Sequence, residues 1–249
     1  MLPANTERIL ARLKEGDRVL DVGGWAAPFR PATHVLDLMP FATRGVMGGY
    51  GPEPERFSAE TWVQGDICAR EPWPWADDYF DFALCVTTLE DIRDPIWVCS
   101  ELSRVAKAGY VEVPTLFAEL IYNVEGNGTW LGHEHHRWLV EEEDGGLVFT
   151  HKPHSLHPDW RVRVLPRWAE TMTLEDHLLG LFWEGELRAR ERVVIGPFPT
   201  EELVAKVRAR FRPTRRELAL KEARERARGL VARAKLPLRR AVERALSRR

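Results

Sequence analysis

Short apolar segments separated by polar turns run through the first half of the chain. Each is about four to eight residues long, which is the length of a strand rather than of a helix. Residues 6–14 and 94–106 instead repeat apolar residues at helical spacing. We predict strands over residues 18–22, 34–38, 61–64, 79–86 and 109–113. This alternation predicts an α/β class, with a Rossmann-like, mostly parallel sheet flanked by helices.

The pattern changes after Pro114. Residues 123–145 are rich in Gly, His, Glu and Trp and only weakly periodic, so we interpret residues 118–145 as a loop insertion. Further strands are predicted over residues 146–151, 161–165 and 192–195, with a helix over 173–183 that starts at Thr173. We expect one domain over residues 1–199 and a basic helical C-terminal extension over residues 200–249.

Composition places the chain among ordinary soluble globular proteins. Of its 249 residues, 44% are hydrophobic and 30% are charged. No apolar run reaches the roughly 18 residues of a membrane-spanning helix, and the first residues lack the pattern of a secretory signal. The three cysteines have no paired short spacing, so we expect free buried thiols and a cytoplasmic protein.

Charge is distributed unevenly along the chain. Residues 212–249 hold 14 Lys and Arg against 4 Asp and Glu, whereas the whole chain has a net charge of −2. A basic amphipathic helix suits an anionic membrane surface, such as the inner face of the membrane, or an acidic partner. A solvated helix packed on the body or on a second subunit is the alternative. Nucleic acid is a less favoured partner, because the tail carries no aromatic-rich recognition module.

Acidic residues close three successive predicted strands. Asp21 precedes Gly23-Gly24, Asp37 ends the second strand, and Asp66 follows the third. Glycines let the backbone approach a ligand closely, and nucleotide-like ligands bind at the carboxyl ends of parallel strands. A carboxylate at the second strand can accept hydrogen bonds from both ribose hydroxyls. The sequence therefore predicts a nucleoside site at this edge of the sheet.

The same residues resemble the type-11 group of class I S-adenosylmethionine-dependent methyltransferases. Residues 19–24, 80–95 and 101–115 are similar to the family's first motif, fourth-strand motif and following helix and strand, and the resemblance covers roughly residues 5–117. It implies S-adenosylmethionine as cofactor, and it implies that the cofactor is bound by Asp21, Gly23, Gly24, Asp37, Leu38, Asp66, Ile67 and Val86. Residues 132–138 more loosely resemble a subgroup of bacterial glycan and cell-envelope enzymes.

Two positions depart from the family pattern. The glycine turn lacks a third glycine and continues Trp25-Ala26-Ala27-Pro28, and Asp91 stands where many relatives have histidine. A nicotinamide-dependent dehydrogenase is the competing interpretation. It would require a G-x-G-x-x-G turn, and the proline here is poorly placed within the helix that follows such a turn.

Four residues are candidates for the acceptor side. Three histidines within four residues can supply a base near neutral pH, and Asp91 follows the fourth strand. We predict catalytic roles for Asp91, His133, His135 and His136. We expect no metal, although the histidines with Asp91 or Glu134 could ligate one. Stacking or hydrogen bonding within a loop is the purely structural alternative.

The predicted function is transfer of a methyl group from S-adenosylmethionine to a small-molecule or glycan acceptor, at oxygen. One alternative is an RNA methyltransferase that uses the basic tail. A second is a binding module that keeps the fold but has no turnover.

Overall fold

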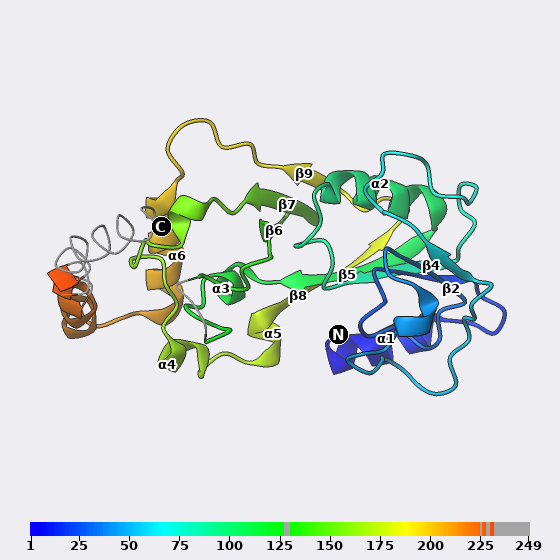
Figure 1. Ribbon diagram of the computed structural model, residues 1–249, viewed down its shortest axis with the longest axis horizontal. Coiled ribbons are helices and arrows are strands. Elements are labelled where there is room, and N and C mark those ends of the chain that lie inside the picture. Colours follow the sequence, from blue (N-terminus) through cyan, green and yellow to red (C-terminus); the bar gives the residue numbers. More distant parts are fainter. Residues whose placement is uncertain (127–129, 225, 228–229, 232–249) are drawn as a thin grey trace, which may run out of the picture.

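The computed structural model describes residues 1–126, 130–224, 226–227 and 230–231. The molecule is elongated, with the central sheet in one half and helices α3 to α6 toward the other (Figure 1). The N-terminal helix α1 lies beside the sheet, at the other end of the molecule from α6 (Figure 1). No helix among the described residues is long and apolar enough to cross a membrane.

A six-stranded sheet forms the centre of the fold, in the order β3-β2-β1-β4-β5-β8. Strands β1 to β5 are parallel, and β8 runs antiparallel along the edge of β5. The strands are β1 (Val19–Val22), β2 (His34–Asp37), β3 (Trp62–Gln64), β4 (Phe82–Val86), β5 (Ala108–Pro114) and β8 (Leu178–Glu184). The predicted fold class is confirmed, and the ends of the five predicted strands lie within three residues of their observed positions.

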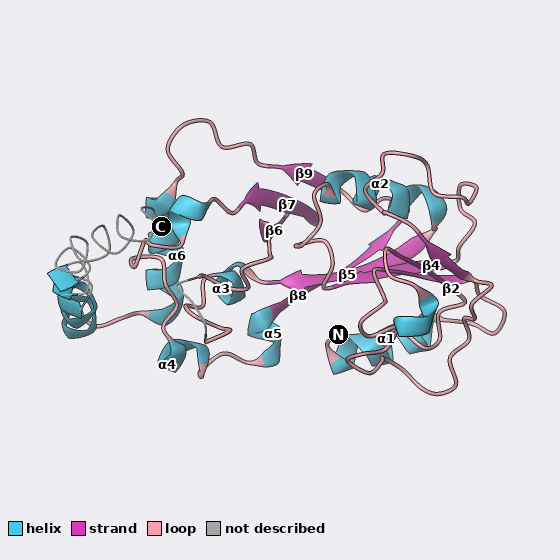
Figure 2. Ribbon diagram, in the orientation of Figure 1, coloured by secondary structure: helices cyan, strands magenta, loops and turns pink. Residues whose placement is uncertain are grey.

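Helices cover both faces of this sheet (Figure 2). α1 (Pro3–Arg12) packs Ile9 into one apolar cluster with Val19, while α2 (Pro95–Val105) packs Leu102 into the opposite cluster with Leu20. Neighbouring strand residues point to opposite faces, so β1 is buried on both. The α2 helix begins where the sequence predicts, because the Asp94 side chain accepts a hydrogen bond from the Trp97 N–H and Pro95 fills the first turn.

Most connections between the parallel strands are loops. Among β1 to β5, all within the described residues, only the link between β4 and β5 holds an α-helix, and the link between β2 and β3 has a short 3-10 helix, η1 (Phe41–Thr43). The link from β1 to β2 contains Pro28 and Pro31, which remove backbone donors and prevent a helix. This loop lies directly at the carboxyl end of the sheet.

A second, smaller unit lies beyond β5. A three-stranded sheet in the order β6-β7-β9 packs next to α2, and helices that precede, interrupt and follow its strands in the sequence complete the unit. Its elements are β6 (Trp138–Glu143), β7 (Gly146–His151), β9 (Ala189–Glu191), α3 (Leu116–Glu119), η2 (His154–Leu156), α4 (Pro166–Ala169), α5 (Leu174–His177) and α6 (Thr200–Phe211). The predicted strand at residues 146–151 is confirmed.

Three predictions in this half were wrong. The helix over 173–183 begins at Thr173, which forms a capping box with Asp176, but ends at His177, and β8 follows. An apolar run does not distinguish strand from helix, and pairing with the open edge of β5 decides it. Residues 161–165 form a loop with one isolated bridge, between Val164 and Ile121. Residues 192–195 leave the sheet after β9, so Ile195 is 92% exposed.

The insertion also contains structure that the sequence pattern concealed. β6 occupies residues 138–143, where the pattern had predicted a loop. Basic side chains from distant segments neutralise the glutamates at its end. The Lys206 Nζ lies 2.6 Å from a Glu141 oxygen, and Arg190 pairs with Glu143. These partners are far away in the sequence, so local periodicity could not indicate the strand.

The start of the C-terminal extension packs on the body. α6 buries Leu203, Val204 and Val207 in a cluster with the residues around α3 and α4. Residues 215–224 are helical, and the buried Lys221 donates a hydrogen bond to the Arg163 carbonyl at 2.9 Å. Most of the predicted basic interaction segment at 212–249 lies outside the described residues, so its role stays a prediction. The three cysteines, Cys68, Cys85 and Cys99, are buried and free, as expected.

Candidate functional site

A large cavity opens at the carboxyl ends of the parallel strands. Its volume is about 1110 Å³. One end lies at the loops that follow β1, β2 and β3, and the other lies between the loop after β4 and the segment that precedes β6. This position includes the gap between β1 and β4, where the strand order reverses and ligands of open α/β sheets bind. The predicted residues that line it are Gly23, Asp37, Leu38, Asp66, Ile67, Asp91, His133, His135 and His136.

The glycine turn after β1 is fixed by close packing. Gly23 has a φ of +78°, a conformation that side chains rarely adopt, and a Cβ there would lie 2.3 Å from the Thr88 hydroxyl. A Cβ on Gly24 would lie 2.2 Å from a carboxylate oxygen of Asp21. Both glycines are therefore required by space, and the bare backbone at Gly23 forms part of the cavity wall.

Asp21 lies behind this turn. Its carboxylate is 2% exposed and accepts a hydrogen bond from the Phe29 N–H at 2.7 Å. Burial raises the pKa of this carboxyl from 3.8 to about 7, although the Phe29 hydrogen bond opposes the shift. Asp21, Gly24 and Val86 are not among the residues that line the cavity, because all three are packed under it. Their predicted contact with a cofactor stays untested.

Asp37 holds the loop and faces the cavity. One carboxylate oxygen accepts from the Trp25 N–H at 3.0 Å and the other from the Met39 N–H at 2.7 Å. Burial raises the pKa of Asp37, and these backbone hydrogen bonds lower it in part. Each oxygen keeps a further lone pair for a ligand. Trp25 and the exposed Leu38 form the neighbouring wall.

Asp66 has an ion-pair partner that the sequence did not indicate. The Arg93 guanidinium lies 2.7 Å from its carboxylate and also donates to the Cys68 carbonyl at 2.7 Å. The hydrogen bond from Arg93 lowers the pKa of Asp66, so the carboxylate is ionised. Ile67 lines the cavity beside it. A ligand that uses Asp66 must share it with Arg93.

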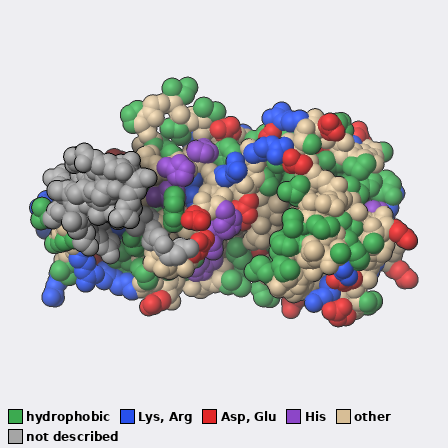
Figure 3. Space-filling model, viewed as in Figure 1, with side chains coloured by type: hydrophobic (Ala, Val, Ile, Leu, Met, Phe, Trp, Pro, Cys, Tyr) green, Lys and Arg blue, Asp and Glu red, His purple; other side chains and the backbone are tan. Residues whose placement is uncertain are grey.

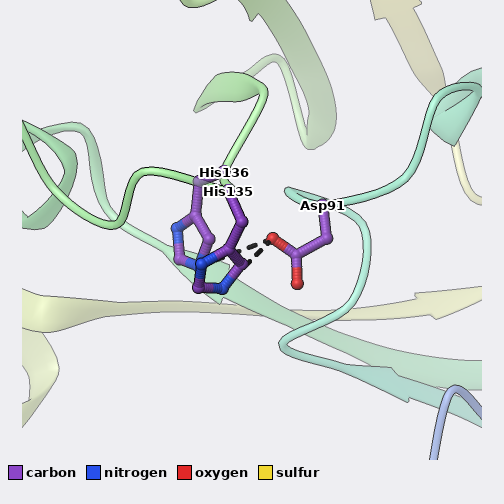
Figure 4. Close-up of side chains that lie close together, drawn as sticks. All are labelled: Asp91, His135 and His136. Carbon is purple, nitrogen blue, oxygen red and sulfur yellow. Dashed lines mark ion pairs between the residues drawn. The ribbon is translucent and has the colours of Figure 1, made fainter.

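Asp91, His135 and His136 converge at the other end of the cavity (Figure 4). The Asp91 Oδ1 lies 3.5 Å from the Nε2 of His136 and 3.8 Å from the Nε2 of His135. Burial raises the pKa of Asp91, and the neighbouring histidines oppose that shift. His133 lies beside them and contacts Glu125, with Nδ1 and Oε1 3.1 Å apart. On the face drawn in Figure 3, histidine side chains gather next to acidic ones in the middle of the molecule.

A buried ion pair fixes the segment that carries the histidines. The Lys152 Nζ donates to a Glu119 oxygen at 2.6 Å and to the carbonyls of Leu131 and His133 at 3.1 Å each. Gly132, between them, has a φ of +58°, and a Cβ there would lie 2.6 Å from the Glu119 carboxylate. Lys152 and Glu119 are 1% and 2% exposed, so the pair lies in the interior.

The other oxygen of Glu119 orients His136. The two groups are 2.5 Å apart, with the His136 Nδ1 as the nitrogen involved. Burial by itself would raise the pKa of Glu119, but this hydrogen bond and the Lys152 charge outweigh it, so the pKa is lowered. An ionised Glu119 accepts a hydrogen bond from the Nδ1–H of His136, and the Nε2 of the ring then lies on the side of Asp91. Nothing in the sequence signalled Glu119 or Lys152 beyond a lone charge next to apolar residues.

Glu90 supplies a further carboxyl to the cavity wall. It is 1% exposed, and its Oε2 has no hydrogen-bond partner among the described residues. Burial raises the pKa of Glu90 well above its ordinary value. A neutral, buried carboxyl can donate a hydrogen bond to a ligand in the cavity.

Comparisons with known proteins give no family. No protein family and no curated protein matches this chain. A Bacillus halodurans protein described as a methyltransferase aligns over 45% of this chain and 50% of its own, at 21% identity and a TM-score of 0.33. S-adenosylmethionine-dependent methyltransferases align from Thermotoga maritima (46% and 51%, 23% identity, TM-score 0.29) and Mesorhizobium loti (59% and 62%, 16% identity, TM-score 0.32).

The chain therefore spans less than two thirds of the length of each of these three structures. Because the identities and TM-scores are low, we infer the function from the cavity and not from these similarities.

Asp21 predicts a pH dependence of stability. Its folded-state pKa of about 7 lies above the unfolded value of 3.8, so the protonated Asp21 carboxyl contributes to the free energy of unfolding. This contribution is complete below about pH 4 and is lost as the pH rises through about 7. In the parent, the free energy of unfolding should fall by on the order of 3 kcal/mol between about pH 5 and about pH 8 because of Asp21. Asp21→Asn, which mimics the neutral carboxyl, should lack this part of the fall. Urea unfolding of both proteins at both pH values measures this. Equal losses in variant and parent would contradict the assignment.

The Lys152–Glu119 pair predicts a large cost when one partner is removed. Lys152→Met leaves a buried carboxylate without its counter-charge and should lower the free energy of unfolding by about 3–5 kcal/mol. The matched control is Lys107→Met, whose amine pairs with Asp81 at the surface and should cost less than about 1 kcal/mol. Similar losses for the two variants in chemical denaturation would show that the buried pair does not hold the segment.

Proposed function

We propose that the protein transfers a methyl group from S-adenosylmethionine to an oxygen of a small-molecule or glycan acceptor. The observation that carries the proposal is one continuous cavity with two chemically different ends. At one end are carboxylates that close parallel strands, and at the other are a carboxylate and histidines. A nucleoside cofactor and a hydroxyl acceptor need these two environments, held side by side.

The cofactor binds at the ends of β1, β2 and β3. Asp37 accepts hydrogen bonds from the ribose hydroxyls with the lone pairs that its backbone partners leave, and the bare backbone at Gly23 allows close approach. Asp66 and Ile67 contact the adenine, and Leu38 packs beside it. Asp21, Gly24 and Val86 act from beneath, by shaping the turn and its floor.

The acceptor binds beyond the end of β4. Methyl transfer is an in-line displacement, so the enzyme must hold the acceptor oxygen close to the sulfonium methyl and collinear with the breaking bond. A hydroxyl must also lose its proton. Asp91, His135 and His136 supply groups that bind the hydroxyl and favour its ionised form, and His133 completes this wall.

The walls of this end support a small polar acceptor. Arg137 and Glu170 line the cavity together with the apolar side chains of Ile92 and Pro166. A mixed lining of this kind suits a sugar or another polyhydroxylated molecule, whose ring has apolar and polar faces.

The proposed role of Asp37 predicts that changing this residue weakens cofactor binding. Asp37→Asn removes one charged acceptor from the ribose site and should weaken S-adenosylmethionine binding by roughly tenfold to hundredfold. Asp81→Asn, at the opposite end of β4, is the matched control and should leave affinity unchanged. Isothermal titration calorimetry measures both. If neither variant loses affinity, or if both lose it equally, the nucleoside does not bind at Asp37.

Changes at the acceptor end should lower turnover without lowering cofactor affinity. We expect His136→Asn to lower methyl transfer about a hundredfold or more while S-adenosylmethionine affinity changes less than about threefold. The assay follows labelled methyl into fractionated cell extract, with Asp37→Ala as the blank. Cofactor binding without transfer into any fraction would favour a binding module. Label confined to RNA, and lost when residues 212–249 are deleted, would favour an RNA methyltransferase.

A further inference from the structure

We propose that Asp91, His135 and His136 bind a divalent transition-metal ion at the acceptor end of the cavity. One oxygen of Asp91 and one nitrogen from each ring lie within 4.8 Å of one another. The two histidines come from the segment before β6 and Asp91 comes from the loop after β4, and all three side chains point to a common centre (Figure 4). The proposal departs from the expectation, drawn from sequence, of no metal.

These atoms lie farther apart than hydrogen-bonded partners, yet close enough to share one ion. The Asp91 Oδ1 is 3.5 Å and 3.8 Å from the two ring nitrogens, beyond the usual N–H···O distance. This oxygen is buried and has no hydrogen-bond partner among the described residues. Buried carboxylate oxygens normally have a partner, and a cation between the three groups supplies it.

Glu90 provides a second observation in favour of a polar ligand at this end of the cavity. Its buried Oε2 also has no partner in the described part of the chain, and the residue lines the same cavity. Two carboxyls that are adjacent in the sequence thus have oxygens available to a polar ligand in the cavity. An ion held by Asp91 and carrying a bound water or hydroxyl would satisfy both.

His136 is oriented as a metal ligand usually is. Its Nδ1 is paired with the buried Glu119, and its Nε2 faces Asp91 at 3.5 Å. Metal-bound histidines generally donate their other ring N–H to a carboxylate, which fixes the tautomer and increases ligand basicity. Lys152 in turn fixes Glu119.

A second trio shares His135 but fits less well. Glu125, His133 and His135 also have three ligand atoms within 4.8 Å. There, however, the His133 Nδ1 already lies 3.1 Å from the Glu125 oxygen, at hydrogen-bond distance. The carboxylate of that trio is thus engaged by one of its own histidines, whereas the Asp91 oxygen is not. The ion therefore belongs with Asp91, and Glu125 serves as an outer partner of His135, 4.0 Å from its Nδ1.

The donor set indicates the class of ion. Two imidazole nitrogens and one carboxylate oxygen suit Zn²⁺, Fe²⁺, Co²⁺ or Mn²⁺, whereas Mg²⁺ and Ca²⁺ prefer all-oxygen sites. Three protein ligands leave coordination positions open, which is the arrangement of catalytic rather than structural zinc sites. Asp91, His135 and His136 all line the cavity, so a small molecule bound there can reach an ion that they hold.

The ion's role rests on the proposed function. A metal-bound hydroxyl has a much lower pKa than a free one, so the acceptor ionises near neutral pH and releases its proton to water. Its oxygen then attacks the methyl carbon of the sulfonium. The carbon–oxygen bond forms as the carbon–sulfur bond breaks, and sulfur keeps the electron pair as a neutral thioether.

Metal binding is tested without cofactor or acceptor. Tag-free, chelator-treated protein is titrated with Zn²⁺ by calorimetry and with Co²⁺ by visible absorption, and we expect one ion per chain. His135→Ala, at a position 59% exposed on the surface, should weaken Zn²⁺ binding at least about tenfold without affecting folding. Asp91→Ala should do the same, and Glu119→Gln should weaken binding about tenfold through His136.

Matched histidine variants identify the site. His154→Ala removes an exposed ring outside the cavity, and His133→Ala removes the competing trio, so each should change Zn²⁺ affinity less than about threefold. Absence of a stoichiometric ion, or unchanged affinity in both His135→Ala and Asp91→Ala, overturns the site.

The two proposals fail in different ways. Zn²⁺ binding without S-adenosylmethionine binding would keep the ion site and overturn the methyl-transfer proposal. Methyl transfer that continues at full rate after metal removal would overturn the ion's role and keep methyl transfer. If both proposals hold, chelation lowers transfer at least about tenfold, and added Zn²⁺, Co²⁺ or Mn²⁺ restores it.

Discussion

A buried lysine–glutamate pair fixes the geometry of the site. Lys152 follows β7 and Glu119 ends α3, and their contact ties two carbonyls of the histidine segment to the interior. Leaving either charge unpaired in this position is costly, so the segment has little freedom to move. Glu119 also fixes the ring of His136, and thereby the direction in which its free nitrogen points. Glu119 and Lys152 thus preorganise the end of the cavity that the histidines line.

The sheet topology fixes the other end. Strands β1 and β4 are neighbours, but the chain leaves them toward opposite sides, which opens the space that the cavity occupies. Loops rather than helices follow β1, β2 and β3, so backbone and carboxylates meet this space directly. Asp37 holds the loop and also lines the cavity, whereas Asp21 is buried behind the glycine turn and accepts a hydrogen bond from the Phe29 N–H. Two carboxylates with similar positions in the sequence pattern therefore have different physical roles.

The sequence was informative where local pattern and global fold agree. The five parallel strands, α2 and the clustering of Asp37, Asp66 and Ile67 at one edge follow from buried apolar runs that end in polar residues. It failed where distant partners decide. β8 is a strand because β5 offers an open edge, and Arg93 meets Asp66 only through the fold. Lys152 and Glu119 carry no pattern at all, since the depth of a lone charge depends on tertiary packing.

The central claim is that one cavity holds an adenosyl cofactor and a metal-assisted acceptor side by side. A crystal structure of the full chain with S-adenosylhomocysteine and Zn²⁺ tests it most directly. We expect ribose hydroxyls on the Asp37 carboxylate, a metal peak among Asp91, His135 and His136, and the thioether sulfur turned toward that peak. A nucleoside bound away from Asp37, or one whose sulfur faces away from the histidines, would contradict it.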